Sequence, residues 1–320
     1  MTIKVIITRD FDHMSEIAAE IVKDLILKIL KKKEELVFGL ATGHSPTGLY
    51  KNLANFLNSN EIDNKRFCSF NLDEYIGLPG ENAQQRVLHP ESYCYFMIQE
   101  FFGLLNKKFR ETNVPFGNLI DQKTLTKELD IHPNDYIELG KDAGKSIMIK
   151  EKTESKYLAW IRETILNAYL KKIENVGGID LQIIGVGGRG HVAFHESGIP
   201  FEGSDMMLIK LDENTINNAI KDGHFSNRDN SPHYAISMGT ELVYKAKNII
   251  LLASGTRKTD PVAESLLNTP TPEVPISYGQ KYSEKGGNLI YILDKIAAQK
   301  LMTNRRILEK KGIEFKLIEY

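Results

Sequence analysis

The sequence Leu181-Gln-Ile-Ile184 is followed directly by Gly185-Val-Gly-Gly-Arg-Gly-His-Val-Ala-Phe-His-Glu-Ser-Gly198. The apolar run is typical of a short buried strand, and the glycines after it let a backbone turn sharply or approach a ligand closely. Histidine and glutamate can transfer protons near neutral pH. Because ligands of open α/β sheets bind at the carboxyl ends of strands, the pattern predicts an active-site loop. A flexible surface turn is the alternative interpretation.

Similar short apolar runs recur along the chain, and helical patterns separate most of them. Strand-like runs span Ile3–Thr8, Leu36–Leu40, Arg66–Asn71, Met206–Leu211, Ala235–Met238, Asn248–Ala253 and, as the last, Leu289–Leu293. This alternation predicts an α/β fold, with a mainly parallel sheet covered by helices on both faces. We expect residues 1–320 to form a single domain, and the looser, more polar pattern within 112–178 suggests an insertion or a lid. In the first helix, we expect Asp12 and Ser15 to cap the start and Ile17, Ile21, Leu25 and Ile29 to share one face.

The composition is that of an ordinary globular protein. Hydrophobic residues make up 42% of the 320 residues, charged residues 26%, and the formal net charge is -1. This balance argues against binding to nucleic acid or to a membrane surface, because both need a strong basic excess. The amino-terminal residues are too strand-like for a signal peptide, and no run approaches a membrane span, so we expect a cytoplasmic protein. Cys68 and Cys94 are predicted to be buried free thiols, and no His or Cys spacing suggests a metal site.

Two further loops have the pattern of anion-binding sites. Ala41-Thr-Gly-His-Ser-Pro-Thr-Gly48 links a strand to a helix, for which Ser45 is the expected cap and Pro46 the first residue. Ser254-Gly-Thr-Arg-Lys258 follows another buried strand and adds two cations. The free N–H groups of a helix start hold phosphate in many proteins, although a capped helix without a ligand explains the first loop equally well.

Asp73 and Glu74 follow the strand that ends at Asn71. A carboxylate at this edge of the sheet is a candidate general base, and an Asx-turn is the ordinary alternative.

Five segments, taken together and in this order, resemble the glucosamine-6-phosphate deaminase/isomerase family: Gly39–Pro46, Asn71–Pro79, His89–Tyr93, Gly185–Gly198 and Ser254–Lys258. The resemblance implies a Rossmann-like three-layer fold and conversion of an amino-sugar phosphate into fructose 6-phosphate with release of ammonia. It also implies that no cofactor is needed and that the chain could form a homo-oligomer. A galactosamine phosphate or another amino-sugar isomer remains open as the substrate.

The resemblance also implies roles for individual residues. Asp73 would move a proton between sugar carbons 1 and 2, and His191 would open the pyranose ring with Glu196 hydrogen-bonded to its imidazole. The phosphate would be held by the residues Thr42, Gly43, His44, Ser45 and Lys258.

Two positions depart from the family pattern. Many members have Asp where this chain has Arg189, and they usually have an Arg that clamps the phosphate where this chain has Leu208. We hypothesise that Arg189, Arg257 or His44 supplies the missing positive charge. The 6-phosphogluconolactonases are a competing family with a similar loop, but they usually have an Arg after Asp-Glu, where this chain has Tyr75. A non-catalytic sugar-phosphate sensor is the third alternative.

Overall fold

The computed structural model describes residues 3–319, which form two β-sheets. All eight strands of the main sheet are parallel, in the order β13-β1-β12-β11-β8-β2-β3-β5. These strands are β1 (Ile3–Thr8), β2 (Leu36–Leu40), β3 (Phe67–Asn71), β5 (Glu111–Asn113), β8 (Leu181–Ile184), β11 (Asn248–Ala253), β12 (Asn288–Asp294) and β13 (Glu314–Leu317).

Helices cover both faces of the main sheet. One face packs against α1 (Phe11–Leu30), α2 (Thr47–Asn58) and α4 (Tyr93–Glu100). The opposite face packs against α7 (Ala168–Asn175), α9 (Thr240–Val243), α10 (Thr259–Leu267), α11 (Tyr278–Glu284), α12 (Gln299–Thr303) and α13 (Arg305–Lys310). The predicted Rossmann-like three-layer α/β sandwich with a mainly parallel sheet is therefore confirmed.

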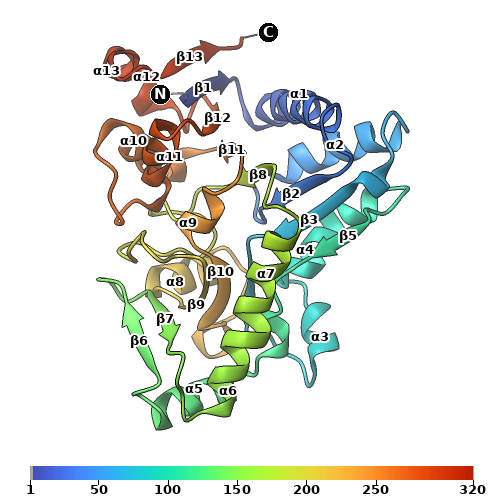
Figure 1. The fold of residues 1–320 in the computed structure, drawn as a ribbon. Helices are drawn as coiled ribbons and strands as arrows, with labels where there is room; N and C mark the ends of the chain where they lie inside the picture. The colour runs from blue at the N-terminus through green and yellow to red at the C-terminus, as the bar shows by residue number, and fades with distance from the viewer. Residues whose placement is uncertain (1–2, 320) are drawn as a thin grey trace.

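A second sheet of five antiparallel strands lies below the main sheet in the view of Figure 1. Its order is β4 (Asp73–Ile76), β10 (Tyr234–Met238), β9 (Met206–Lys210), β7 (Lys145–Ile149) and β6 (Tyr136–Leu139). The runs Met206–Leu211 and Ala235–Met238 are strands as predicted, but they belong to this sheet, since an apolar run does not reveal the direction of its neighbours. The hairpin of β6 and β7 lies in the polar region where the sequence has no clear periodicity.

The two faces of the second sheet have different neighbours. One face packs against α5 (Gln122–Ile131), α6 (Lys156–Trp160) and the π-helical segment η4 (Ile161–Asn167), and Leu208 is fully buried there. The other face packs against Phe194 and Ile199 of the glycine-rich loop and against α8 (Glu213–Lys221). The strand alternation of β9 therefore directs Leu208 away from the loop.

Several predicted helix details are wrong. Asp10, not Asp12 or Ser15, caps α1, and its side chain accepts a hydrogen bond from the His13 N–H. The fully buried stripe of α1 is Met14, Ala18, Val22 and Ile26, whereas Ile17, Ile21, Leu25 and Ile29 are only partly buried. Helix α2 begins at Thr47, after Pro46, and has no side-chain cap. The two sets of residues form adjacent apolar stripes with the same helical spacing. Periodicity alone therefore did not show which stripe is buried more deeply.

The remaining elements are short. They are α3 (Ala83–Val87) and the 3-10 turns η1 (Asn64–Arg66), η2 (Phe102–Leu104), η3 (Gly117–Leu119), η5 (Arg228–Asn230), η6 (Thr256–Lys258) and η7 (Pro275–Ser277). Leu289–Leu293 lies within β12 but is not the last strand, because β13 pairs with β1 at the sheet edge.

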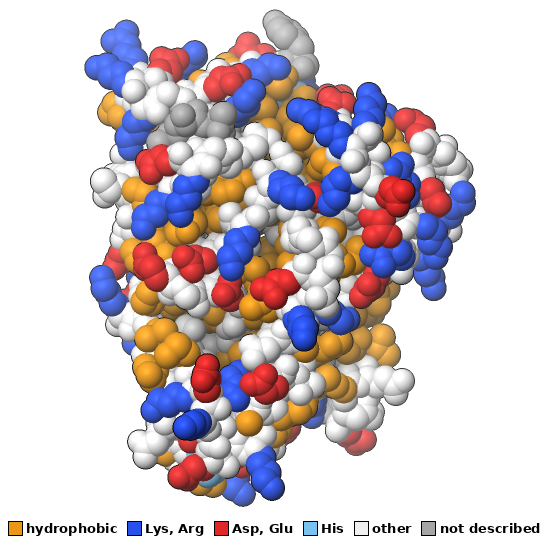
Figure 2. Space-filling view, in the orientation of Figure 1, with side chains coloured by type: hydrophobic (Ala, Val, Ile, Leu, Met, Phe, Trp, Pro, Cys, Tyr) orange, Lys and Arg blue, Asp and Glu red, His pale blue; other side chains and the backbone are white. Residues whose placement is uncertain are grey.

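The charge distribution on the surface agrees with the prediction from composition, whereas the predicted burial of both cysteines is only partly confirmed. On the face that Figure 2 shows, Lys and Arg side chains are interspersed with Asp and Glu. Cys68 is a buried free thiol, but Cys94 is only half-buried. Within residues 3–319, no helix is both long and apolar enough to cross a membrane.

Candidate active site

A cavity of about 750 Å³ opens where the carboxyl ends of β2, β8 and β11 meet the second sheet. Its wall is made by residues from segments 41–45, 72–73, 185–187, 191–194, 222–224 and 254–258, together with Tyr93. Segments distant in sequence thus converge at the edge of the parallel sheet, where α/β proteins bind ligands.

The first predicted anion loop presents free backbone donors to this cavity. The Tyr50 hydroxyl donates a 2.6 Å hydrogen bond to the Ala41 carbonyl and so fixes the start of the loop. Gly43 has a φ of 91°, a conformation that favours glycine. Within residues 3–319, the backbone N–H groups of 42–45 donate to no other group. They lie just before α2, so they and the helix dipole can attract an anion.

The second anion loop is organised by Asp294 at the end of β12. Its Oδ2 accepts hydrogen bonds from the Ser254 hydroxyl at 2.6 Å and from the Gly255 N–H at 2.9 Å. Lys258 lines the cavity, and burial, with a further contribution from Arg257, lowers the pKa of its ammonium group. Arg257 also lines the cavity, where its Nη1 pairs with Asp222 Oδ2 at 2.9 Å. Two cations therefore border the same pocket as the free N–H groups.

Asp73 and Glu74 lie on strand β4 rather than in a turn, so their side chains point to opposite faces of the second sheet. Glu74 is saturated: its carboxylate accepts hydrogen bonds from the Tyr75, Tyr93 and Cys94 N–H groups, the Ser92 hydroxyl and the Asn118 amide. These partners tie β4 to the start of α4. Glu74 is therefore a structural carboxylate.

Asp73 has the opposite character, because it lines the cavity and its Oδ1 has no hydrogen-bond partner among the described residues. Its residue is only 5% exposed. Burial, and then the nearby Glu74 carboxylate, raise the pKa of Asp73 well above its ordinary value. A desolvated carboxylate without a partner is a stronger proton acceptor than a solvated one, which suits a general base.

His191 lines the cavity and lies beside Glu196, with its Nδ1 3.5 Å from Glu196 Oε2. The ring rests directly over Gly187, where an added Cβ would lie 1.8 Å from the His191 ring atoms. Glu196 is 2% exposed and does not line the cavity, so it can act only through the imidazole. The pair is thus an imidazole facing the cavity with a buried carboxylate behind it.

His195, the second histidine of the loop, is a structural residue. Its Nδ1 accepts a hydrogen bond from the Thr240 N–H at 3.2 Å, and its Nε2 lies 3.0 Å from the Ile199 carbonyl, to which it can donate. The ring is fully buried, and this burial lowers the pKa of His195 to about 4. It is neutral at pH 7 and joins the loop to the start of α9.

The structure brings together most of the residues predicted from the sequence. The cavity is lined by Asp73, His191, Thr42, Gly43, His44, Ser45, Arg257 and Lys258. Arg189 does not line it: its guanidinium contacts Asp142 and Asp212 instead, and its side chain is 45% exposed. Leu208 does not line the cavity either, because its side chain points to the helix-covered face of the second sheet.

Three cavity residues were missed by sequence reasoning. Tyr93 belongs to the His89–Tyr93 motif, which could have indicated it, and its ring packs against Tyr75 and Phe194. Asp222 and His224 follow α8 with no motif of their own. In the part of the chain that the structure describes, no three His, Cys, Asp or Glu side chains are grouped so that they could hold a metal ion.

Comparison with known proteins gives relatives that match almost the whole chain. The glucosamine-6-phosphate deaminase of Thermoanaerobacter sp. (strain X514) is 35% identical over 295 residues, covering 92% of this chain and 94% of the relative. That of Clostridium acetobutylicum is 32% identical over 298 residues, covering 93% of this chain and 100% of the relative. No family model matches the chain.

Solved structures share the fold at lower identity. A monomeric glucosamine-6-phosphate deaminase matches with a TM-score of 0.67 at 24% identity, covering 94% of this chain and 100% of its own. The 6-phosphogluconolactonase from Trypanosoma cruzi matches with a TM-score of 0.59 at 19% identity, covering 93% of this chain and 96% of its own.

Proposed function

The chain belongs to the glucosamine-6-phosphate deaminase family, and from this premise we propose that it converts glucosamine 6-phosphate into fructose 6-phosphate and ammonia. One observation carries the proposal beyond the sequence relationship. A buried Asp73, whose Oδ1 has no hydrogen-bond partner within residues 3–319, shares one cavity with the imidazole of His191 and with two loops suited to phosphate. A deaminating isomerase needs these groups together, because the phosphate must fix the sugar while a base removes a carbon-bound proton.

The proposed reaction begins with ring opening. The cavity-facing His191 imidazole assists transfer of the O1 hydroxyl proton to the ring oxygen, and the C1–O5 bond breaks to give the open-chain aldehyde. Glu196, at 3.5 Å from Nδ1, holds the ring orientation and stabilises the protonated imidazole that forms in transit.

Asp73 then acts on the open chain. Its carboxylate removes the proton from C2, which the neighbouring aldehyde makes acidic, and returns it to C1, while the aldehyde oxygen gains a proton and the C2 amine loses one. The resulting C2 imine is hydrolysed by water, which leaves a C2 ketone and releases ammonia. The raised pKa of Asp73 fits a group that must both accept and return this proton.

Phosphate binding is assigned to the donors around the cavity. We infer that the N–H groups of 42–45, together with Lys258 and Arg257, hold the phosphate, with His44 at the same rim. This assignment accounts for the missing Arg at Leu208, since two cations from the 254–258 loop already face the pocket. Arg189, whose guanidinium is engaged elsewhere, is left out of it.

A substrate panel tests the proposal. Ammonia release and fructose 6-phosphate formation are measured with glucosamine 6-phosphate and galactosamine 6-phosphate, and acid release with 6-phosphogluconolactone. We expect turnover of an amino-sugar phosphate. Lactone hydrolysis alone would favour the lactonase alternative, and tight binding of sugar phosphates without turnover would favour a sensor. Oligomeric state and cytoplasmic location stay predictions.

A further inference from the structure

The turn between β6 and β7, residues 140–144, packs against the glycine-rich loop. The Lys141 N–H donates to the Gly198 carbonyl at 3.2 Å, and the Gly144 N–H donates to Asp212 Oδ2 at 3.3 Å. Gly144 also packs closely against Glu196, since a Cβ added at position 144 would lie only 2.8 Å from Glu196 Cβ. A turn from the polar, irregular part of the sequence thus lies directly behind the proposed acid–base pair.

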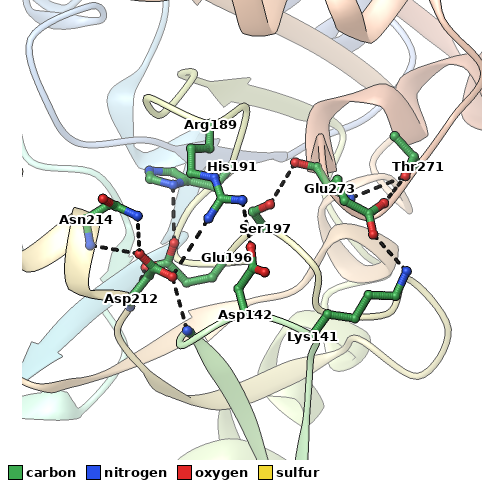
Figure 3. Close-up of polar contacts among 11 residues, drawn as sticks. Lys141, Asp142, Arg189, His191, Glu196, Ser197, Asp212, Asn214, Thr271 and Glu273 are labelled. Atoms are coloured by element: carbon green, nitrogen blue, oxygen red, sulfur yellow. Dashed lines mark hydrogen bonds and ion pairs between the residues drawn. The ribbon is translucent and has the colours of Figure 1, made fainter.

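Arg189 fastens this turn to the loop. Its Nη2 lies 2.6 Å from Asp142 Oδ2 in the turn, and its Nη1 lies 3.9 Å from Asp212 Oδ2 (Figure 3). One planar guanidinium therefore faces two carboxylates, one in the β6–β7 turn and one at the N-cap of α8, a geometry that lysine does not reproduce. An isolated exposed ion pair contributes little to stability, so a role for Arg189 must come through what its partners contact.

Asp212 carries the connection to the imidazole. It caps α8 through Asn214, and its own N–H donates to Glu196 Oε1 at 3.3 Å. The other oxygen of Glu196 faces His191 Nδ1. Both carboxylate oxygens of Glu196 are therefore assigned, one to Asp212 and one to the histidine, and the orientation of the carboxylate depends on where Asp212 and Gly144 lie.

We propose that the β6–β7 turn is a positioning element for the His191–Glu196 pair and that Arg189, acting through Asp142 and Asp212, is the positioning residue that holds it. Strand β9 anchors β7, but β6 pairs only with β7 among the described strands and is partly exposed, so the sheet restrains the β6 end of the turn weakly. The Arg189 contacts add to the restraint that the Lys141 and Gly144 N–H groups give. This inference rests on the proposed deaminase function, because it concerns ring opening by that pair.

Replacing Arg189 tests the inference, with Lys141→Gln as a matched control. Lys141 lies in the same turn and makes a 2.8 Å ion pair with Glu273, whose backbone carbonyl accepts a hydrogen bond from the Ser197 hydroxyl. Unlike the Arg189 contacts, these contacts include neither Asp212 nor the Glu196 carboxylate. For Arg189→Gln we expect kcat for glucosamine 6-phosphate to fall about 10-fold, with KM and the thermal midpoint nearly unchanged, since misplacement of a reacting group costs rate rather than binding. Lys141→Gln should keep the wild-type kcat. Equal kcat values for both variants would overturn the proposal.

A double-mutant cycle and an exchange measurement separate positioning from simple structural support. If Arg189 acts through Asp142, the pair Arg189→Gln with Asp142→Asn should be no slower than either single variant, whereas additive losses would contradict a shared path. Amide hydrogen exchange at Lys141 and Gly144 should speed up in Arg189→Gln. This measurement needs no substrate, so it still tests whether Arg189 restrains the β6–β7 turn if the wild-type protein proves inactive on amino-sugar phosphates. Unchanged exchange would overturn the proposal independently of the assay.

Gly144→Ala tests the positioning of the His191–Glu196 pair without changing any charge. The new methyl group must displace Glu196 or Asp212, whose Cβ atoms it would meet at 2.8 and 3.2 Å. We expect kcat to fall by about as much as in Arg189→Gln, again with little change in KM. A wild-type kcat in Gly144→Ala would show that the turn does not position Glu196.

Discussion

The two sides of the cavity are built in different ways. The phosphate side, residues 42–45 and 254–258, is made by loops that directly follow parallel strands β2 and β11. Its donors are backbone N–H groups and long cationic side chains. The proton-transfer side is made by Asp73, His191 and Glu196, and it depends on the second sheet and on contacts between residues far apart in sequence.

The difference follows from what each side must do. The phosphate stays charged throughout the reaction and exchanges no proton with the protein. The groups that bind it therefore do not need burial to shift a pKa. A general base works better when burial raises its pKa, and burial requires protein on every side. Changes on the phosphate side should therefore alter mainly KM, and changes on the proton-transfer side mainly kcat.

The largest effect is expected for Asp73→Asn, which removes the proposed base. We expect kcat to fall about 10³-fold or more while the fold is kept. The variant should also be more stable at pH 7, because a carboxyl group whose folded pKa is raised opposes folding when it is ionised. This gain in thermal midpoint should shrink as the pH falls and disappear below 3.8, the ordinary pKa of Asp, because wild-type Asp73 is then neutral in both states.

Glu74→Gln is the matched control for that prediction. It leaves Asp73 in place but puts an amide NH₂ among groups that already donate, so it should lower the unfolding free energy by about 1–3 kcal/mol. Activity at a temperature where the variant is folded should stay far above that of Asp73→Asn. If the two acids gave the same kinetic loss, the division of their roles would be wrong.

The next effect in size concerns Gly187, over which the imidazole rests. Gly187→Ala would force the His191 ring to move, and we expect kcat to fall about 100-fold. Gly188→Ala is the comparison, because its added Cβ would meet only the Asn218 amide at 3.8 Å. Steady-state kinetics of the two variants would locate the constraint at one glycine. Similar losses in both would point instead to general stiffening of the loop.

A smaller effect, and in a different parameter, is expected on the phosphate side. Lys258→Met should raise KM for the sugar phosphate, and Ki for inorganic phosphate, by about 10- to 100-fold, because it removes one charged hydrogen-bond donor. Its kcat should change much less. Lys245→Met provides the control, since Lys245 pairs with Asp205 outside the cavity. A fall in kcat without a rise in KM would place Lys258 on the proton-transfer side.

The smallest effect is expected for His195, which supports the loop but does not line the cavity. Its folded pKa of about 4 lies below the ordinary 6.5, so it stabilises the fold above pH 6.5 and loses this contribution as the pH falls towards 4. His195→Gln keeps a donor for the Ile199 carbonyl but does not titrate. Between pH 7 and pH 5, the thermal midpoint of wild type should fall by a few degrees more than that of the variant. Parallel melting curves would contradict a neutral buried histidine.

Much of the phosphate side could be predicted from the sequence. In each anion-binding loop a strand end is followed directly by small residues and a helix start. Residues 42–45 and 254–258 could therefore be identified as anion-binding loops from the local pattern alone. The resemblance also named Asp73, His191 and Glu196, whereas the residue pattern alone did not separate Asp73 from Glu74, whose carboxylate accepts five hydrogen bonds. That difference lies in hydrogen bonds from Ser92, Tyr93 and Asn118, residues well separated from Glu74 in sequence.

The sequence by itself determined the three-layer α/β fold, the order of the loops and the identity of most cavity residues, because strand periodicity and glycine chemistry act over a few neighbouring residues. The tertiary structure alone decided that β4, β9 and β10 form a second, antiparallel sheet and that Leu208 faces its helical side. It also decided that Arg189 turns away from the cavity to the β6–β7 turn. These features depend on which distant segments pack together, and burial of a carboxylate or pairing of a guanidinium follows from that packing rather than from adjacent residues.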